Sequence, residues 1–319
     1  MRCRRSWCRE GDGVRAGGIG LYFAAVLGAA RHEVTVVGRE STVAAAGRAP
    51  LVLTRGGERL EVPGVAAVSA VSEIAEPPDL VVVSVKAWQV REAAAALAPV
   101  LGPRTVVLPL QNGVEASGEL VAALGPGGVL GASCVVIAQR TEPWAVTCLG
   151  PDATLEIGPA TADFDAALDP VVAALTEAGV GITRSEDISA TLWRKLMLIS
   201  SYGGVGALSR QPVGLTASCP QTRELVRAAM IEVLRVARAK DVRLADADVD
   251  RMMKVFEGFS PDTTSSMQRD LLAGRPSELE YQNGAVVRFG RETGVPTPIH
   301  ETVYASQLPG ELAARRELT

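Results

Sequence analysis

The chain has few lysines and histidines, and these shortages limit the chemistry that it can perform. Of its 32 basic residues only four are lysines: Lys86, Lys195, Lys240 and Lys254. The pKa of a lysine can be moved towards neutrality so that the ammonium gives up a proton, which an arginine does not do. With only His32 and His300 present, neither a histidine-based metal site nor a catalytic triad is expected.

Cysteines and long apolar runs are also scarce. The five cysteines, at positions 3, 8, 134, 148 and 219, are scattered and odd in number, which argues against a disulfide framework and against a zinc site. No uninterrupted apolar run is long enough to cross a membrane, and the basic residues 1–9 lack the apolar segment of a signal peptide. We therefore expect a cytoplasmic protein without a metal ion and without a membrane partner.

The composition is that of an ordinary globular protein with enough residues for two domains. The 319 residues are 47% hydrophobic and 21% charged, and a formal net charge of −4 gives no reason to expect nucleic acid as a partner. Strand patterns fill the first half and helix patterns the second. We predict an α/β fold, with a Rossmann-type doubly wound sheet in residues 1–184 and an all-helical domain in residues 185–319.

A glycine-rich turn near the start is typical of a dinucleotide-binding unit. Gly17, Gly18, Ile19 and Gly20 lead into a helix of small residues and then into a buried strand predicted over 32–39. The N-terminus of such a helix binds a pyrophosphate. Arg39, at the end of this strand, suits a 2′-phosphate, where an acidic residue would bind a ribose diol, so NADP(H) is favoured over NAD(H). A glycine turn without a ligand is the simpler explanation of the tetrapeptide alone.

The glycine fingerprint is incomplete. Arg15 stands where a first glycine belongs, and residues 9–14 do not resemble the hydrophobic strand that should precede it, so we expect the first strand to be missing. One hypothesis is that the residues before Ala16 come from a shifted reading frame, which resequencing of the 5′ end of the gene tests. If these residues are authentic, Arg15 should crowd the pyrophosphate site and weaken cofactor binding.

Two further strands bring polar residues to the edge of the sheet. A hairpin is predicted over 51–62, buried strands over 80–86 and 105–110, and antiparallel strands over 129–138, 145–148 and 154–157. Lys86 ends the first buried strand and Asn112 follows the second, and open α/β sheets bind ligands at such carboxyl ends. Asn112 is followed by glycine, and a turn alone also explains this pair.

Lys195 lies in an apolar stretch of the helical half, where a cation is costly. A helix through this stretch puts Lys195, Ile199 and Gly203 on one stripe, with Tyr202 beside it. Lys195 is either a proton donor or a side chain that snorkels at a helix edge. Glu278 is either the partner of such a lysine or a solvated carboxylate at a helix start. Further helices are predicted over 222–240, 246–256, 265–272 and 277–293.

Six short motifs follow one another from Gly17 to the end of the chain: GGIGLYF, VKAWQV, QNG, LWRKL, SSMQRD and ELEYQNG. Each is weak by itself, but their order and spacing together are specific, and the chain resembles the ketopantoate reductase (2-dehydropantoate 2-reductase) family. The resemblance implies NADPH-dependent reduction of ketopantoate, a 2-oxo acid, to the 2-hydroxy acid pantoate in pantothenate biosynthesis.

The resemblance also implies roles for single residues. Lys195 matches the general acid of the family, and Glu278 matches the carboxylate that helps to hold the substrate and the lysine. The remaining matches are substrate or cofactor contacts at Asn112 and Ser266, a cofactor-side lysine at Lys86 and the 2′-phosphate contact at Arg39. The chemistry agrees, because an ammonium within hydrogen-bond reach stabilises and protonates the alkoxide that hydride transfer leaves.

Two positions depart from the family pattern. The pattern places asparagines one and two helical turns after the lysine, where this chain has Ile199 and Gly203. The asparagine amides would hydrogen-bond the substrate, and the loss of each such buried partner costs about 1–3 kcal/mol of interaction free energy. Tyr202 is the nearest residue that could replace them as a substrate contact. We therefore expect the preferred 2-oxo acid to be bulkier or more apolar than ketopantoate.

Three functions are compared. The first is reduction of ketopantoate, and the second is reduction of another 2-oxo acid by a paralogue, which Ile199 and Gly203 favour. The third is a defective or purely nucleotide-binding member of the family, which Arg15 and the absent strand favour. The helices after Ser277 also leave room for a homodimer.

Overall fold

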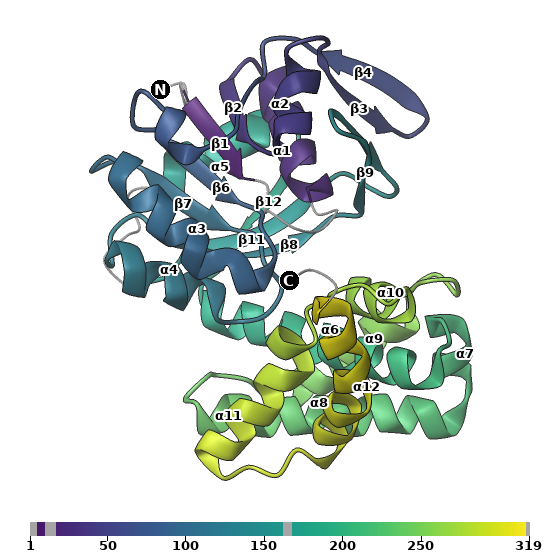
Figure 1. Cartoon of the computed structure of the whole chain (residues 1–319). Helices are drawn as coiled ribbons and strands as arrows, with labels where there is room; N and C mark the ends of the chain where they lie inside the picture. The colour runs from purple at the N-terminus through teal and green to yellow at the C-terminus, as the bar shows by residue number, and fades with distance from the viewer. Residues whose placement is uncertain (1–4, 10–16, 162–167, 317–319) are drawn as a thin grey trace. The chain divides into compact units, whose positions relative to one another are not determined.

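The structure is a computed structural model that describes residues 5–9, 17–161 and 168–316 (Figure 1). It divides into two compact units: residues 1–111 with 115–188, and residues 112–114 with 189–319. The sequence-based boundary lies between 184 and 185. It assigned 112–114 to the first domain, whereas these three residues pack with the helical unit.

A parallel sheet of five strands organises the first unit. Its order is β5-β2-β1-β6-β7, and all neighbouring strands run parallel, as in a doubly wound dinucleotide-binding fold. The strands are β1 Arg5–Arg9, β2 Glu33–Val37, β5 Ala66–Val68, β6 Leu80–Val83 and β7 Val106–Pro109. The helices of this unit are α1 Gly18–Ala29, α2 Glu40–Ala46, α3 Val90–Leu97, α4 Ala116–Leu124 and α5 Leu168–Glu177, with short 3₁₀ turns at Val71–Glu73, Ala87–Gln89 and Ala98–Val100. The predicted α/β fold is confirmed.

The expectation of a missing first strand is wrong. Residues Arg5–Arg9 form β1 in the middle of the sheet, paired in parallel with β2 on one side and β6 on the other. The ladder uses only backbone N–H and C=O groups, so an extended segment closes the gap between β2 and β6 whatever its side chains are. This strand therefore lacks the apolar run that the sequence prediction required next to the glycine turn. Arg15 lies outside the described residues.

Both faces of the parallel sheet are covered. Leu80 and Val82 of β6 pack in the cluster that contains α1 and α5, whereas Val81 and Val83 pack in the cluster that contains α3 and α4. Successive residues of a strand point to opposite faces, which is why a strand buried on both faces is apolar throughout. All four residues of β6 are buried, as the sequence predicted.

Two smaller sheets complete the first unit. The predicted hairpin is confirmed as β3 Leu51–Arg55 and β4 Glu58–Val62, turning at Gly56 and Gly57 with φ of 55° and 83°. These strands continue through β10 Ala145–Cys148 to β9 Ala138–Glu142 in the order β4-β3-β10-β9. The third sheet has the order β12-β11-β8, formed by β12 Gly181–Arg184, β11 Thr154–Pro159 and β8 Leu130–Val135.

The second unit is helical in its described residues, as predicted. Its elements are α6 Ile188–Ser209, α7 Val213–Ser218, α8 Pro220–Ala239, α9 Asp246–Glu257, α10 Ser266–Leu272, a π-helical turn at Glu280–Gly284, α11 Ala285–Thr293 and α12 Pro298–Arg316. The long α6 and α8 contribute Leu196, Met197, Val226 and Val233 to a common core. The π-helical turn interrupts the single helix expected over 277–293.

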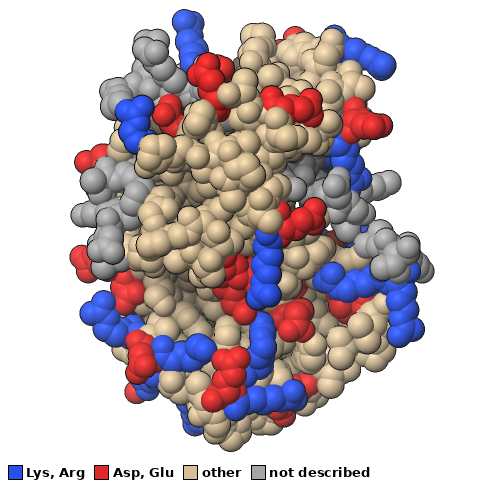
Figure 2. Space-filling view, turned by 60° about the vertical axis from the view of Figure 1, so that its left-hand side comes forward, with Lys and Arg blue, Asp and Glu red and all other residues tan. Residues whose placement is uncertain are grey.

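The surface carries charges of both signs. In the face shown in Figure 2, Lys and Arg side chains lie among Asp and Glu side chains over much of the lower part, and uncharged residues form broader areas above them. Among the described residues, no helix is both long and apolar enough to cross a lipid bilayer.

Candidate active site

The glycine turn stands at the N-terminus of α1, as a pyrophosphate site requires. Gly17 is the residue before the helix, with φ of 127°, and no described side chain caps this end. The first amides of a helix have no partner within it, and the helix dipole favours an anion there. A Cβ at Gly18 would overlap the carbonyl oxygen of Ala138, so this glycine also lets β9 pack against the helix. Gly20 is buried and Ile19 is partly exposed.

Arg39 and Lys86 lie after two strands of the same sheet. Arg39 follows Gly38 at the end of β2 and precedes α2, where its carbonyl oxygen accepts the amides of Thr42 and Val43. Its side chain is partly exposed. The ammonium of Lys86, which follows β6, lies 5.9 Å from the centroid of the Trp88 ring. The helix N-terminus, guanidinium and ammonium present in this unit fit the phosphates of a nicotinamide dinucleotide.

Asn112 and Glu278 are brought together within the helical unit. The Asn112 side-chain amide donates to Oε2 of Glu278 at 3.0 Å. Gly113 has φ of 99°, and a Cβ at this position would lie 2.9 Å from the carbonyl oxygen of Tyr281. The glycine therefore lets the chain approach the π-helical turn closely enough for Asn112 to contact Glu278. Glu278 is 6% exposed, so it is not the solvated carboxylate of the alternative interpretation.

Lys195 lies on α6 and is partly exposed. Lys195, Ile199 and Gly203 follow one another at intervals of four residues on this helix, and Ile199 packs partly against the helical core. The π-helical turn is tied to the same helix, because Asn283 donates to the carbonyl oxygen of Ser200 at 3.1 Å. The segment that carries Glu278 is thereby fixed to the helix that carries Lys195.

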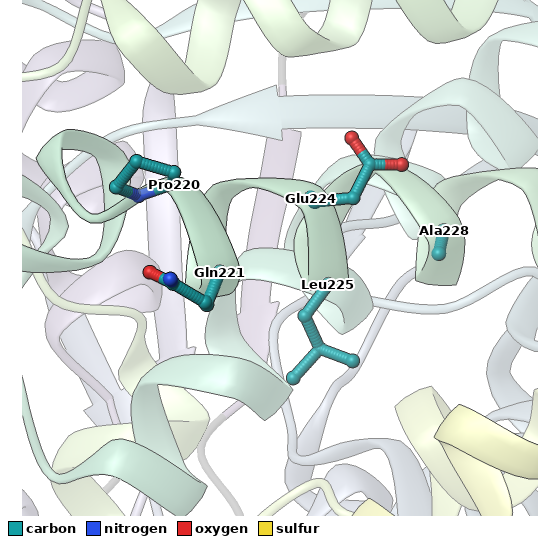
Figure 3. A pocket seen from close by; sticks show the side chains of 5 residues that line it. All are labelled: Pro220, Gln221, Glu224, Leu225 and Ala228. Carbon is teal, nitrogen blue, oxygen red and sulfur yellow. The ribbon is translucent and has the colours of Figure 1, made fainter.

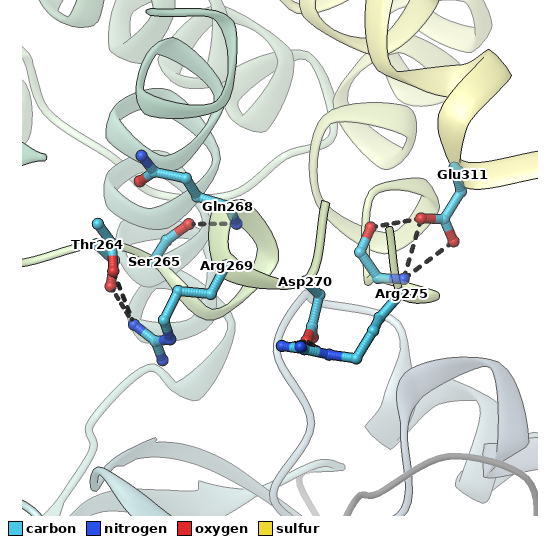
Figure 4. A network of polar contacts seen from close by, with 8 residues as sticks. Thr264, Ser265, Gln268, Arg269, Asp270, Arg275 and Glu311 are labelled. Carbon is cyan, nitrogen blue, oxygen red and sulfur yellow. Dashed lines mark hydrogen bonds and ion pairs between the residues drawn. The ribbon is translucent and has the colours of Figure 1, made fainter. Parts of the chain in front are cut away.

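Ser265 stands beside Gly203 and was missed by the sequence interpretation. A Cβ at Gly203 would lie 2.6 Å from the Ser265 hydroxyl oxygen, which accepts the amide of Gln268 and caps α10 (Figure 4). One turn further, the Gln268 side chain lies against Gly206 and donates to its carbonyl oxygen at 3.0 Å. The absence of an asparagine at 203 thus allows close packing of α10 on α6. The two glycines on one face of α6 were the available signal.

Tyr202 and Ser266 occupy different environments. The Tyr202 ring stacks on Phe256, with centroids 6.2 Å apart, and packs against Phe259. Burial raises the pKa of its hydroxyl to about 12, opposed by the charge of Arg269. Ser266 is the partly exposed first residue of α10. A substrate contact by either residue stays a prediction.

The pocket drawn in Figure 3 lies elsewhere. It is lined by Pro220, Gln221, Glu224, Leu225 and Ala228 of α8, and none of the candidate site residues belongs to it. Within the described ranges, no group of three or more His, Cys, Asp or Glu side chains is placed to hold a metal ion.

Comparison with known proteins agrees with this arrangement. Residues 16–162 match the family "Ketopantoate reductase PanE/ApbA", and residues 187–307 match "Ketopantoate reductase PanE/ApbA C terminal". The chain is 32% identical to the 2-dehydropantoate 2-reductase of Mycobacterium tuberculosis over 93% of its own length and 98% of that protein. The matched part of the first family begins one residue before the glycine turn.

Solved structures extend the likeness over nearly the whole chain. A PanE/ApbA family ketopantoate reductase from Ralstonia eutropha JMP134 superposes with a TM-score of 0.85 at 30% identity, covering 99% of this chain and all of that one. A D-mandelate dehydrogenase, solved with NADH and anilino(oxo)acetate, has a TM-score of 0.86 over 98% of this chain and 99% of that one. At 22% identity, this second likeness shows the fold alone.

A doubly wound sheet with a glycine turn, joined to a helical unit that carries a lysine and a buried carboxylate, defines an NAD(P)-dependent oxidoreductase acting on a CH–OH group. Within this class, the chain belongs to the ketopantoate reductase family.

Proposed function

We propose that the protein reduces a 2-oxo acid to a 2-hydroxy acid with NADPH, and that ketopantoate, reduced to pantoate in pantothenate biosynthesis, is the first substrate to test. The observation that carries the proposal is the hydrogen bond from Asn112 to the buried Glu278, in the unit that also carries Lys195. Arg39, directly after β2, supports NADPH over NADH because its guanidinium suits a 2′-phosphate.

In this reaction Lys195, Glu278 and Asn112 have separate roles. A bound nicotinamide supplies the hydride. The Lys195 ammonium stabilises the negative charge that develops on the substrate's 2-oxygen and donates a proton to it. Glu278 accepts hydrogen bonds from the substrate and orients Lys195, and Asn112 holds the Glu278 carboxylate in place. Binding these groups in a fixed arrangement lowers the entropic part of the barrier.

A second candidate is a 2-oxo acid that is bulkier or more apolar than ketopantoate. Ile199 stands where the family pattern has one asparagine. Gly203 stands where it has the second, and the Ser265 side chain lies beside this glycine. D-mandelate dehydrogenase, which shares this fold, was solved with anilino(oxo)acetate, and phenylglyoxylate is a 2-oxo acid that carries an aromatic ring, so it is a suitable probe. Comparison of kcat/KM for the two acids separates the candidates.

The test is the rate of NADPH and NADH oxidation by purified protein over a range of oxo-acid concentrations. Lys195→Arg keeps the charge but removes a donor whose pKa can approach neutrality, so kcat should fall by about 10²- to 10⁴-fold. Lys254→Arg, at an exposed position of α9, is the matched control and should leave kcat unchanged.

Three results would contradict the proposal. Full activity of Lys195→Arg would remove Lys195 from the proton transfer. A preference for NADH would remove the role given to Arg39. If no oxo acid is reduced and NADPH does not raise the unfolding temperature, the protein neither turns over nor binds the cofactor.

A further inference from the structure

Ser277, the residue before Glu278, is bound to α12 through its amide, its hydroxyl and its carbonyl. The amide donates to both carboxylate oxygens of Glu311, at 3.1 and 3.0 Å, and the hydroxyl donates to Oε2 at 2.7 Å. The Ser277 carbonyl oxygen accepts from Arg315 at 2.9 Å. In Figure 4 the dashed lines at the Glu311 carboxylate mark its three contacts with the amide and hydroxyl of Ser277. The position of this one residue is therefore set by the C-terminal helix.

Burial of the Glu311 carboxylate costs desolvation free energy that helix packing by apolar side chains would not. Glu311 is 3% exposed, Ser277 is fully buried, and Nε of Arg315 lies 2.7 Å from Oε1 of Glu311. A buried ion pair is often no more stabilising than apolar side chains of similar volume, whereas removal of one partner is strongly destabilising. Stability alone does not explain a carboxylate here, and the directional bonds to Ser277 supply the missing reason.

The backbone of Glu278 is held on both sides. Before it, Ser277 is fixed by Glu311 and Arg315. After it, the Glu278 carbonyl oxygen accepts the amides of Tyr281 and Gln282, at 3.1 and 3.0 Å, as the π-helical turn begins. With the backbone held, only rotations about the side-chain bonds of Glu278 could move its carboxylate. The hydrogen bond from Asn112 restrains these rotations. The loop before Ser277 is held as well, since Arg275 binds Asp270 at 2.8 Å.

We propose that Glu311, supported by Arg315, is a positioning residue for Glu278. It acts through Ser277 and keeps the Glu278 carboxylate where Asn112, Lys195 and the substrate meet it. The inference rests on the proposed function, in which Glu278 binds the substrate and orients Lys195.

Glu311→Gln tests the inference because the amide keeps the size but loses the charge and one acceptor. We expect kcat/KM for the oxo acid to fall by about 10- to 100-fold, since small displacements of reacting groups have effects of this order. The Kd of NADPH, measured by fluorescence, should change less than about twofold, because the residues proposed to bind the phosphates belong to the first unit, whereas α12 belongs to the second. Glu301→Gln is the matched control, since Glu301 lies on the same helix but is largely exposed.

A double-mutant cycle with Glu278→Gln separates positioning from a general loss of structure. If Glu311 acts only through Glu278, adding Glu311→Gln to Glu278→Gln should lower kcat/KM by less than about twofold further. An equal loss in both backgrounds overturns the inference, and so does full activity of the single variant.

Failure of the proposed function is recognised separately. The wild-type protein is assayed first, and if it reduces no oxo acid, the cycle is measured by urea unfolding. Non-additive changes in the unfolding midpoint then support the coupling between Glu311 and Glu278, whereas additive changes overturn it.

Discussion

The side-chain amide of Asn112 donates a hydrogen bond of 3.0 Å to the Glu278 carboxylate across 166 residues of sequence. An amide is neutral, so it orients the carboxylate without cancelling its charge, which stays available to an ammonium or a substrate hydroxyl. The contact gives Asn112 a role beyond the turn that the Asn-Gly pair alone would explain.

Replacing Asn112 should therefore affect turnover. Asn112→Ala removes the donor, and about 1–3 kcal/mol of lost interaction corresponds to about 5- to 150-fold in kcat/KM for the oxo acid. Asn112→Asp should be worse, because two carboxylates at this distance repel each other and one is driven to bind a proton. Steady-state kinetics at several pH values measure both variants. Equal activity of Asn112→Asp and the wild type would remove the contact from the mechanism.

Gly113 should be needed for the same contact. Its φ of 99° is strained for a residue with a Cβ, and that Cβ would lie 2.9 Å from the Tyr281 carbonyl oxygen. Gly113→Ala should destabilise the protein by more than about 1 kcal/mol and lower kcat/KM, because Asn112 moves away from Glu278.

Gly118→Ala is the control for that variant. Gly118 lies inside α4, and a Cβ there would meet nothing within 4 Å. This substitution should stabilise the protein by about 0.5–1 kcal/mol and leave turnover unchanged. Urea unfolding and kinetics on both variants provide the comparison, and equal stability changes would show that Gly113 is not strained.

Local signals predicted much of the fold. The hairpin turn at Gly56 and Gly57 and the apolar strand β6 follow from turn chemistry and from side-chain periodicity, which neighbouring residues determine. The strand β1 was missed because pairing on both sides fixes it, and its residues Arg5–Arg9 lack an apolar pattern. The π-helical turn was missed because its reason is the contact of Asn283 with α6.

The candidate site was predicted residue by residue but not as a set of contacts. Asn112 and Glu278 were both candidates, yet nothing in the sequence placed one against the other. Glu311 was not singled out, since a glutamate in a C-terminal helix is usually solvated. Its spacing offered a signal, because it shares the buried side of α12 with His300 and Ala314.

The environments of Gly203 and Ile199 predict different effects of an asparagine at the two positions. Gly203→Asn should destabilise the protein by about 1–3 kcal/mol, because its Cβ would lie 2.6 Å from the Ser265 hydroxyl oxygen. Ile199→Asn should be tolerated better, since Ile199 is only partly buried, and should raise the ratio of kcat/KM for ketopantoate to that for phenylglyoxylate.

Combining Gly203→Asn with Ser265→Gly checks the cause of the destabilisation. If the Ser265 side chain is the obstacle, the double variant should be more stable than the sum of the two single changes. Additive unfolding free energies would place the obstacle elsewhere. If Ile199→Asn leaves the ratio of kcat/KM for ketopantoate to that for phenylglyoxylate unchanged, position 199 does not determine substrate preference.

His300 predicts a loss of stability in mild acid. Its Nε2 lies 3.1 Å from the Ala229 carbonyl oxygen, which only accepts, so Nε2 carries the proton and Nδ1 accepts from Asn283 at 3.0 Å. Complete burial of this neutral ring lowers the pKa of His300 to about 4. The unfolded chain, with a histidine pKa of about 6.5, takes up a proton first as the pH falls.

The contribution of His300 to stability is therefore complete above about pH 6.5 and is lost as the pH falls towards about 4, by about 3 kcal/mol in all. Urea unfolding at pH 7.5, 6 and 5 should show this decline in the wild type and a flatter profile in His300→Gln. Burial raises the pKa of the neighbouring Glu232, which acts in the opposite direction, but Glu232 is present in both proteins and cancels in their difference. Parallel profiles for the two proteins would contradict the prediction. They would mean that His300 takes up its proton equally in the folded and unfolded states, although both ring nitrogens are bound in the core.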